Sequence, residues 1–260
     1  MITECKNIRK NILNISYISR HGHIPTCFSV IEILHTVYNV MDHKPTEPQS
    51  ENRDIFILSK GHAALALYCT LAQQGYFDIN DVESFGAFGS DFGCHADRNK
   101  IPGIEASTGS LGHGIGLAAG IALSFKIKNS SRKVYTLIGD GEANEGSVWE
   151  AVMVAVNLNL NNLTIIYDNN RSHSRGLQIE NPAGVFESFG CKVEKVDGHD
   201  INSLKNALKS LSKKVKVIVA NTKKGYPCKL LVENQYEWHR KSPNQDQLNQ
   251  LMRELDEETV

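Results

Sequence analysis

Apolar positions along the chain predict an alternation of helices and strands. Ile8, Ile12, Ile15 and Ile18 recur at helical spacing, which predicts an amphipathic helix over residues 3–19. Short apolar runs predict buried strands at 55–59, 133–139, 163–168, 191–198 and 215–222. Helical patterns are found at 29–40, 61–74, 115–126, 147–158 and 201–211. From residue 133 onward strand and helix alternate, so we expect an α/β fold with a parallel sheet and helices on both faces.

The longest segment without a clear period is rich in glycine and lies at residues 86–113. An irregular segment of this length inside a compact domain is usually functional. Three Gly-His pairs, in "RHGH", "KGHA" and "LGHG", could each bring an imidazole close to a ligand or form a surface turn. His199, in "DGHD", is expected to be a turn residue. Because ligands of open parallel sheets bind beyond the carboxyl ends of the strands, the residues that follow each strand are the candidates for a site.

The composition narrows the classes of function. The chain has 260 residues, of which 41% are hydrophobic and 22% charged, enough for one sizeable α/β core or two small domains. Its 28 basic and 29 acidic residues nearly balance, so no basic excess points to nucleic acid. No run of 18 apolar residues occurs, so no membrane span is expected. The six scattered cysteines contain no Cys-x-x-Cys pair and suit a reducing, cytoplasmic compartment.

Two consecutive strands end in oxygen-bearing side chains. Asp140 follows the strand at 133–139 in "LIGDGEANEG", and Asn170 ends "YDNN" 30 residues later. A crossover helix with its turns and one strand takes about that length, so both side chains are expected at the same sheet edge. Carboxylate and amide oxygens suit Mg²⁺ or Ca²⁺, and Mg²⁺ usually adds phosphate oxygens and water. Each segment alone is ordinary turn chemistry, but together they favour a metal-diphosphate site.

At these residues the chain resembles a known family. "GDGEANEGSVWEA" followed by "NLNNLTIIYDNN" is similar to the thiamine diphosphate motif of transketolases, in particular of the amino-terminal subunit of two-chain transketolases. Further matches follow in order, in "SRHGHIPTCFSVIEIL", "FILSKGHAALALY", "GCHADRNKIPGIEASTGSLGHGIGLAAG", "VDGHDINSL" and "NTKKGY" with "ENQYEWH". Since the matches cover essentially the whole chain, the resemblance implies a thiamine diphosphate-binding fold of the diphosphate-binding (PP) type. It also implies a single domain over residues 1–260.

The resemblance implies a cofactor, thiamine diphosphate, held through Mg²⁺, with Ca²⁺ as an alternative metal. The implied metal ligands are Asp140, Asn170 and a backbone carbonyl near Ser172. The other implied cofactor-binding residues are His62, Gly109, Leu111, Gly139, Gly141, Glu142 and His239. Among these, His62 and Gly141 would hold the diphosphate, whereas Gly109 and Leu111 would orient the two rings. Glu142 is included for its place in the motif, without an assigned role.

The resemblance also implies a catalytic set. His23, His95 and His239 would line the substrate channel and transfer protons, a task that suits an imidazole with an ordinary pKa of about 6.5. Glu145 would lie at a dimer interface beside the aminopyrimidine of the paired site. Glu150 would lie there too, unless it belongs to a solvated helix face.

The implied reaction is transfer of a two-carbon ketol unit from a ketose, or a ketose phosphate, to an aldose. The family's pyrimidine-binding domain, with the glutamate that activates the cofactor, and its carboxyl-terminal domain have no counterpart in this sequence. We therefore expect a separate chain to supply both, in an α₂β₂ assembly that is active only with both chains. The implied substrate is a sugar phosphate or a nucleotide-linked sugar.

Several positions near the implied substrate channel depart from the family's pattern. Pro25 and Thr26 replace glycines, Cys94 begins "CHAD" in place of Gly-His-Pro, and Arg240 stands where glycine is common. The segment 171–176 is polar where an apolar residue is usual. These departures predict thiamine chemistry on a narrower or unusual sugar, in a specialised biosynthetic pathway.

Two other functions stay open on the sequence alone. The chain could belong to a different thiamine enzyme, either a 2-oxoacid decarboxylase or dehydrogenase or an enzyme like deoxyxylulose-phosphate synthase. The three channel histidines favour a sugar over a 2-oxoacid. The chain could also be a catalytically silent partner that binds the cofactor. The presence of Asp140, Asn170, His62 and Glu145 counts against that alternative.

Overall fold

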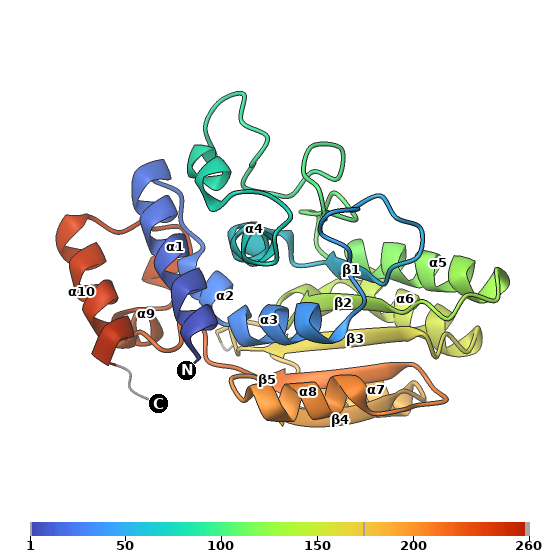
Figure 1. Cartoon of the computed structure of the whole chain (residues 1–260). Helices are drawn as coiled ribbons and strands as arrows, with labels where there is room; N and C mark the ends of the chain where they lie inside the picture. Colours follow the sequence, from blue (N-terminus) through green and yellow to red (C-terminus); the bar gives the residue numbers. More distant parts are fainter. Residues whose placement is uncertain (1, 174, 258–260) are drawn as a thin grey trace.

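The computed structural model describes residues 2–173 and 175–257 and contains a five-stranded parallel sheet (Figure 1). Its strands are β1 (Ile55–Leu58), β2 (Val134–Gly139), β3 (Leu163–Asn169), β4 (Lys192–Asp197) and β5 (Lys216–Asn221). They lie in the order β1-β2-β3-β5-β4, and every neighbouring pair is parallel. The expected α/β fold is confirmed. The predicted domain covers residues 1–260, of which 1, 174 and 258–260 lie outside the described residues. Residue 174 also belongs to the predicted 171–176 segment.

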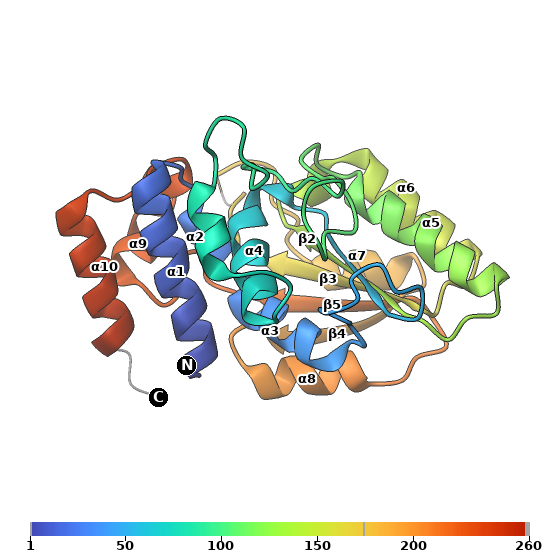
Figure 2. The same cartoon turned by 45° about the horizontal axis from the view of Figure 1, so that its top comes forward.

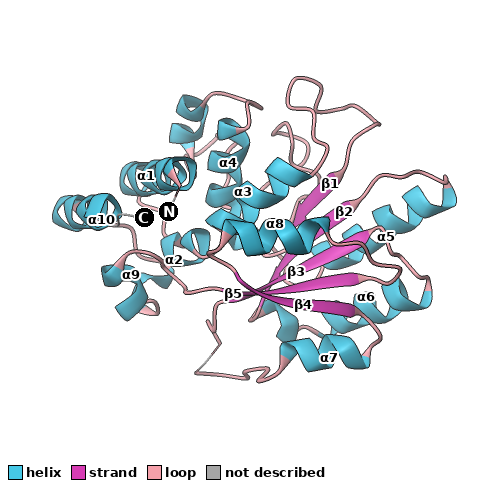
Figure 3. Ribbon diagram, turned by 60° about the horizontal axis from the view of Figure 1, so that its bottom comes forward, coloured by secondary structure: helices cyan, strands magenta, loops and turns pink. Residues whose placement is uncertain are grey.

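Each face of the sheet has its own hydrophobic core, because successive side chains of a strand point to opposite faces. Phe56, Leu137 and Ile218 belong to one core, and their neighbours Ile57 and Val217 belong to the other. The helices that contribute to the first core are α1 (Thr3–Ser19), α2 (Ile24–Phe28), α3 (Ile31–Val40), α4 (Ala64–Gln73), α8 (Ile201–Lys209), α9 (Lys229–Glu233) and α10 (Gln245–Glu257). The second core is covered by α5 (Gly114–Ile127), α6 (Gly146–Asn157) and α7 (Pro182–Ser188). Figure 3 shows α3 and α8 across the sheet from α6 and α7, so helices cover both faces as expected.

The two terminal helices lie together at one side of the molecule. In Figures 1 and 2, α1 and α10 run side by side, and α1 also packs against α4. Leu248, Leu251 and Leu255 of α10 are buried in this packing. Over the part of the chain that the structure describes, no helix is both long enough and apolar enough to cross a bilayer.

Four α-helices lie where the sequence analysis expected none. One of them is α2, which begins at Ile24 with proline in its first turn. This helix is too short for a hydrophobic period to be read. Likewise α7 and α9 have only 7 and 5 residues. By contrast, α10 was overlooked although Leu248, Leu251 and Leu255 carry a helical spacing.

The carboxyl ends of the strands meet at one edge of the sheet and carry the loops that matter for function. Gly139 at the end of β2 is directly opposite Asp168 of β3, so the chain leaves both strands at the same level. A 3₁₀ turn at Gly61–Ala63 follows β1, and the irregular segment at 86–113 separates α4 from α5. The long loop predicted from glycine content is therefore present.

Candidate active site

A cavity of about 570 Å³ opens at the carboxyl edge of the sheet. Nearly all of the predicted site residues line it, namely His23, His62, His95, Gly109, Leu111, Gly139, Asp140, Gly141, Glu142, Asn170, Ser172 and His239. The exception is Glu145, which is exposed at the start of α6 and does not line the cavity. The lining also contains Thr26, Lys60, His173, Lys224 and Tyr236. The structure thus brings together residues from opposite ends of the chain.

Asp140, Asn170 and Ser172 converge where β2 and β3 end. Asp140 and Asn170 are 3% and 5% exposed. Ser172 links them, since its Oγ donates to Asp140 Oδ1 at 2.5 Å and its N–H donates to Asn170 Oδ1 at 3.0 Å. Within the described ranges no cluster of three or more His, Cys, Asp or Glu is placed to hold a metal. One carboxylate beside an amide oxygen and an open cavity fits Mg²⁺, which completes its shell with phosphate oxygens and water.

The space over Gly141 is filled by His173. A Cβ at Gly141 would lie 2.6 Å from Cδ2 of the His173 ring, whereas a Cβ at Gly139 would make ordinary contact with Lys60 at 3.7 Å. The backbone N–H of His173 also donates to Asp140 Oδ2 at 3.3 Å. In this structure, therefore, a side chain at position 141 would first meet the ring of His173, which lines the same cavity.

A buried ion pair lies beneath the cavity. Lys60 Nζ lies 2.5 Å from Asp168 Oδ2, and the two side chains are 1% and 0% exposed. Asp168 also accepts hydrogen bonds from Ser29 Oγ at 3.0 Å, Asn170 Nδ2 at 2.7 Å and Thr222 Oγ1 at 2.5 Å. Because these donors come from the ends of β1, β3 and β5 and from the α2–α3 turn, one carboxylate joins four segments of the cavity wall.

Lys224 brings a second buried cation to the cavity. It follows β5 and is only 7% exposed. Its ammonium forms no hydrogen bond or ion pair with any residue that the structure describes. Burial lowers the pKa of Lys224, and the positive charge of Lys60 lowers it further. A cation in such surroundings favours an anionic ligand, which would stabilise its charged form.

Glu142 has a role that the sequence did not reveal. Its side chain is turned towards protein donors, with Oε1 accepting from Ser59 Oγ at 2.5 Å and from Gly112 N–H at 2.9 Å. Oε2 accepts from Gly139 N–H at 3.1 Å. Burial raises the pKa of Glu142, although these hydrogen bonds oppose the shift. Glu142 therefore ties the end of β1 and the Gly112 loop to the tip of β2, and its carboxylate orients the cavity wall.

Three histidines form a neutral cluster in the cavity. The His23 ring centroid lies 5.9 Å from that of His62 and 5.2 Å from that of His239. Burial, aided by the charge of His239, lowers the pKa of His23 to about 4. Burial and the charge of Lys60 lower the pKa of His62 to about 2, and burial also lowers the pKa of His239. Each neutral imidazole offers one donor and one acceptor, which suits binding of sugar hydroxyls. His95 lines the same cavity from the 86–113 loop.

An apolar surface, the α5–α6 face, adjoins Glu145. Its exposed side chains are Leu117, Met153, Val154 and Leu158, each at least 40% exposed. A second cavity of about 390 Å³ lies along this face and is lined by small and apolar residues together with His113 and Glu150. Since Gly116 and Gly120 of α5 leave open space above their backbone, the face can accept side chains of another molecule.

Lys60, Asp168 and Lys224 are site residues that were not predicted from the sequence. Lys60 stands beside the quoted Gly-His pair, and Lys224 follows the strand at 215–222. A signal was available, because each of the three lies at the carboxyl end of a strand where ligands bind. His199 lies in the turn after β4, as predicted, and its ring in addition makes a hydrogen bond to Glu32 and another to the backbone of Lys223.

The fold and the cavity together define an α/β domain with its ligand site at the carboxyl edge of a parallel sheet. Residues 5–258 match the family model described as transketolase, thiamine diphosphate binding domain. The chain belongs to this family, as the sequence resemblance predicted.

Similar proteins include subunits of two-chain transketolases. The chain is 37% identical to a subunit of the apulose-4-phosphate transketolase of Actinobacillus succinogenes, over 98% of this chain and 95% of that protein. It is 36% identical to a 6-deoxy-6-sulfo-D-fructose transketolase subunit from a Clostridium species, over 78% of each. The crystal structure of the Campylobacter jejuni transketolase superposes with a TM-score of 0.91 at 27% identity, covering 97% of this chain and 42% of that one. The chain thus spans less than half of that transketolase but nearly all of the Actinobacillus protein, and it is a transketolase-type transferase subunit.

Proposed function

We propose that the cavity at the carboxyl edge binds the diphosphate of thiamine diphosphate through Mg²⁺, in one diphosphate-binding domain formed by residues 1–260. The observation that carries the proposal is the buried ammonium of Lys224, which faces the cavity without a carboxylate partner among the described residues. Buried charges are normally paired or bound to a ligand. A diphosphate beside Lys224 and Lys60 would supply the missing negative charge, while Asp140 and Asn170 would share its metal.

The cavity residues fall into groups with separate tasks. Asp140 and Asn170, with the backbone near Ser172, would hold the metal. His62 and the Gly141 N–H, which donates to Asp140 Oδ1 at 2.7 Å in this structure, would hold the diphosphate. Gly109 and Leu111, which line the same cavity, orient the rings. When bound, the cofactor supplies a carbon nucleophile and an electron sink for cleavage of a carbon-carbon bond.

The histidines act on the substrate. His23 and His239 are neutral at neutral pH, because their pKa values are lowered, so they can bind hydroxyl groups without attracting counterions. His23 and His239, with His95, move protons on the donor and acceptor sugars. Together these groups support transfer of a two-carbon ketol unit from a ketose to an aldose.

The sugars proposed are phosphorylated or otherwise anionic. Related subunits carry the names of apulose 4-phosphate and 6-deoxy-6-sulfo-D-fructose, which are both anionic sugars. Thr26 is 2% exposed and narrows the cavity where a glycine is usual in the family. Cys94 and Arg240 line an adjoining cavity of about 220 Å³ that shares His23 and His62 with the main one. These side chains support a narrower substrate range than that of a general transketolase.

A separate chain would supply the pyrimidine-binding domain and its glutamate, in an α₂β₂ assembly. We expect the purified chain to show no measurable ketol transfer alone and to gain it when mixed with that second chain, thiamine diphosphate and Mg²⁺. A coupled assay with a ketose phosphate donor and an aldose acceptor measures the transfer. Robust turnover by the chain alone would refute the need for a partner, and no turnover by the mixture with any ketose would refute the reaction.

The α5–α6 face is the proposed contact with the partner chain, because it is apolar and adjoins Glu145. Val154 belongs to this face, and its side chain is 51% exposed. Because the side chain is exposed, Val154→Glu should leave the fold intact while it places a charge in the contact with the partner chain. Co-purification of the two chains should then weaken by about tenfold or more. Leu211→Glu serves as the control, because Leu211 is also exposed but does not line the cavity of the α5–α6 face. Unaltered association of the Val154 variant would exclude the face as the contact.

A further inference from the structure

The segment that carries Lys224 is held at the residues around it. Thr222 Oγ1 donates to Asp168 Oδ1, the N–H of Lys223 donates to His199 Nε2 at 2.9 Å, and the N–H of Gly225 donates to Pro25 O at 3.0 Å. Lys224 lies between two of these backbone anchors. Its ammonium therefore reaches the cavity from a backbone whose position is set on both sides by other elements.

The anchor at Lys223 depends on the tautomer of His199. The His199 Nδ1 lies 3.0 Å from Glu32 Oε2, and an ionised carboxylate only accepts hydrogen bonds. Nδ1 therefore carries the proton, which leaves Nε2 free to accept from the N–H of Lys223. Burial would raise the pKa of Glu32, but the charge of Arg9 and the hydrogen bonds from His199 and Arg9 outweigh it and lower the pKa to about 2.

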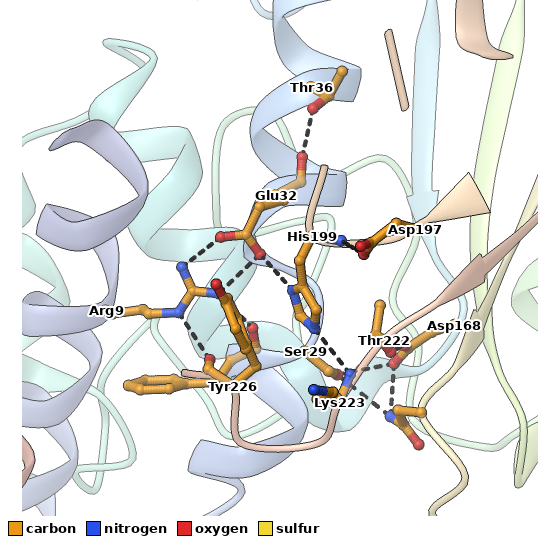
Figure 4. Close-up of polar contacts among 12 residues, drawn as sticks. Arg9, Ser29, Glu32, Thr36, Asp168, Asp197, His199, Thr222, Lys223 and Tyr226 are labelled. Atoms are coloured by element: carbon orange, nitrogen blue, oxygen red, sulfur yellow. Dashed lines mark hydrogen bonds and ion pairs between the residues drawn. The ribbon is translucent and has the colours of Figure 1, made fainter. Parts of the chain in front are cut away.

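Arg9 fixes Glu32 in turn and closes the network (Figure 4). Its guanidinium is fully buried and donates to both carboxylate oxygens of Glu32, at 2.7 and 2.8 Å. Arg9 Nε also donates to the carbonyl of Tyr226 at 3.1 Å, just beyond the Lys224 segment. The Tyr226 ring stacks on His199, with centroids 4.0 Å apart. The network therefore holds the segment at two places, at Tyr226 by Arg9 of α1 and at Lys223 by His199, and Glu32 of α3 orients both side chains.

We propose that His199, oriented by Glu32 and Arg9, is a positioning residue for Lys224. This inference rests on the proposed function, in which Lys224 binds the diphosphate. His199 lines neither the main cavity nor the adjoining one, so it acts on the ligand through the Lys224 segment, which it contacts at the Lys223 backbone and the Tyr226 ring. Loss of the imidazole would free one anchor of the segment and let the Lys224 ammonium leave its place, while the metal ligands at β2 and β3 stay where they are.

The test is a cycle of variants of the full chain, each mixed with the second chain and titrated calorimetrically with thiamine diphosphate in Mg²⁺. His199→Ala should weaken binding by about tenfold, which is the size of a lost hydrogen bond to a charged group, and Lys224→Met should weaken it at least as much. The double variant should be no weaker than Lys224→Met alone, because the two residues act as one unit. His199→Gln, which restores an acceptor for the Lys223 N–H, should recover part of the affinity.

A stability control separates positioning from a general loosening of the fold. Asp200 caps the start of α8 next to His199 and accepts from Asn202 N–H at 2.9 Å and from Ser203 Oγ at 2.5 Å. Asp200→Ala should therefore lower thermal stability without changing affinity. If Asp200→Ala weakens binding as much as His199→Ala does, or if His199→Ala and Lys224→Met are additive, the positioning role is wrong. If Lys224→Met binds as tightly as the wild type, or if the wild type together with its partner chain does not bind, the proposed function itself fails.

Discussion

Replacing Asp140 with alanine is expected to weaken binding of thiamine diphosphate in Mg²⁺ by about 100-fold or more. Changing residues that merely orient metal ligands already lowers metal affinity by about 10- to 100-fold. Loss of the ligand itself should therefore lower the affinity by about 100-fold or more. The fold should persist, because the hydrogen-bond donors to Asp140 are loop groups of Gly141, Ser172 and His173 rather than parts of a helix or strand.

Calorimetric titration of the full chain, mixed with the second chain, measures this effect with and without EDTA. The wild type should lose affinity when EDTA removes Mg²⁺, whereas Asp140→Ala should bind equally weakly in both conditions. Asp78→Ala is the matched control, since it removes a carboxylate that caps the 3₁₀ helix at Ile79–Ser84 and does not line the cavity. Circular dichroism verifies that each variant is folded. An Asp140→Ala protein with unchanged Mg²⁺-dependent affinity would show that the metal lies elsewhere.

The sheet and the tips of β2 and β3 were predictable from the sequence because both follow from local patterns. The apolar runs identified each strand to within one or two residues, and Gly139 and Asp168 are opposite one another in the structure. The spacing of Asp140 and Asn170 was then enough to place two oxygen ligands at one sheet edge. The histidines of the site were predicted from the resemblance to transketolases. Their positions in the sequence do not indicate that His23 and His239 lie side by side in the structure.

The buried charges could not be predicted, because their partners are far apart in the sequence. Lys60 and Asp168 are 108 residues apart, and Arg9 pairs with Glu32 and reaches the carbonyl of Tyr226 217 residues away. A lysine or glutamate in a sequence is ordinarily a solvated surface residue, and only the fold reveals that it is buried. The short helices α2 and α9 were missed for a different reason, since five residues are too few to show a hydrophobic period.

The charges of the site explain how two buried lysines, Lys60 and Lys224, can line the same cavity. The carboxylate of Asp168, 2.5 Å from Lys60 Nζ, balances the charge of Lys60, and the histidines remain neutral. Among the cavity residues that the structure describes, Lys224 is therefore the cation without a carboxylate partner. Asp140 contributes a nearby negative charge that a metal would cancel. Binding of a Mg²⁺-diphosphate therefore adds to the cavity a cation for Asp140 and an anion for Lys224 in one step. The arrangement favours the metal and the diphosphate together over either one alone.

Asp168→Asn is expected to cause the largest loss of stability of any single substitution in the cavity wall. The amide keeps the size of the side chain but removes the charge that balances Lys60, whose side chain is 1% exposed. Removing one partner of a buried ion pair typically costs about 3–5 kcal/mol. For a chain of this size each kcal/mol lowers the melting temperature by about 2–4 °C, so we expect a fall on the order of 10 °C.

Thermal denaturation of the single and double variants decides the cause of this loss. Lys60→Met combined with Asp168→Asn should recover part of the lost stability, because no unpaired charge remains buried. Glu233→Gln is the control: it breaks the exposed pair Lys229–Glu233, whose side chains are 78% and 60% exposed, and should have little effect. If the double variant is no more stable than Asp168→Asn, the unpaired charge is not the cause of the loss, which leaves the altered hydrogen bonds from Ser29, Thr222 and Asn170. Asp168 would then stabilise the cavity wall as a hydrogen-bond acceptor more than as a counterion.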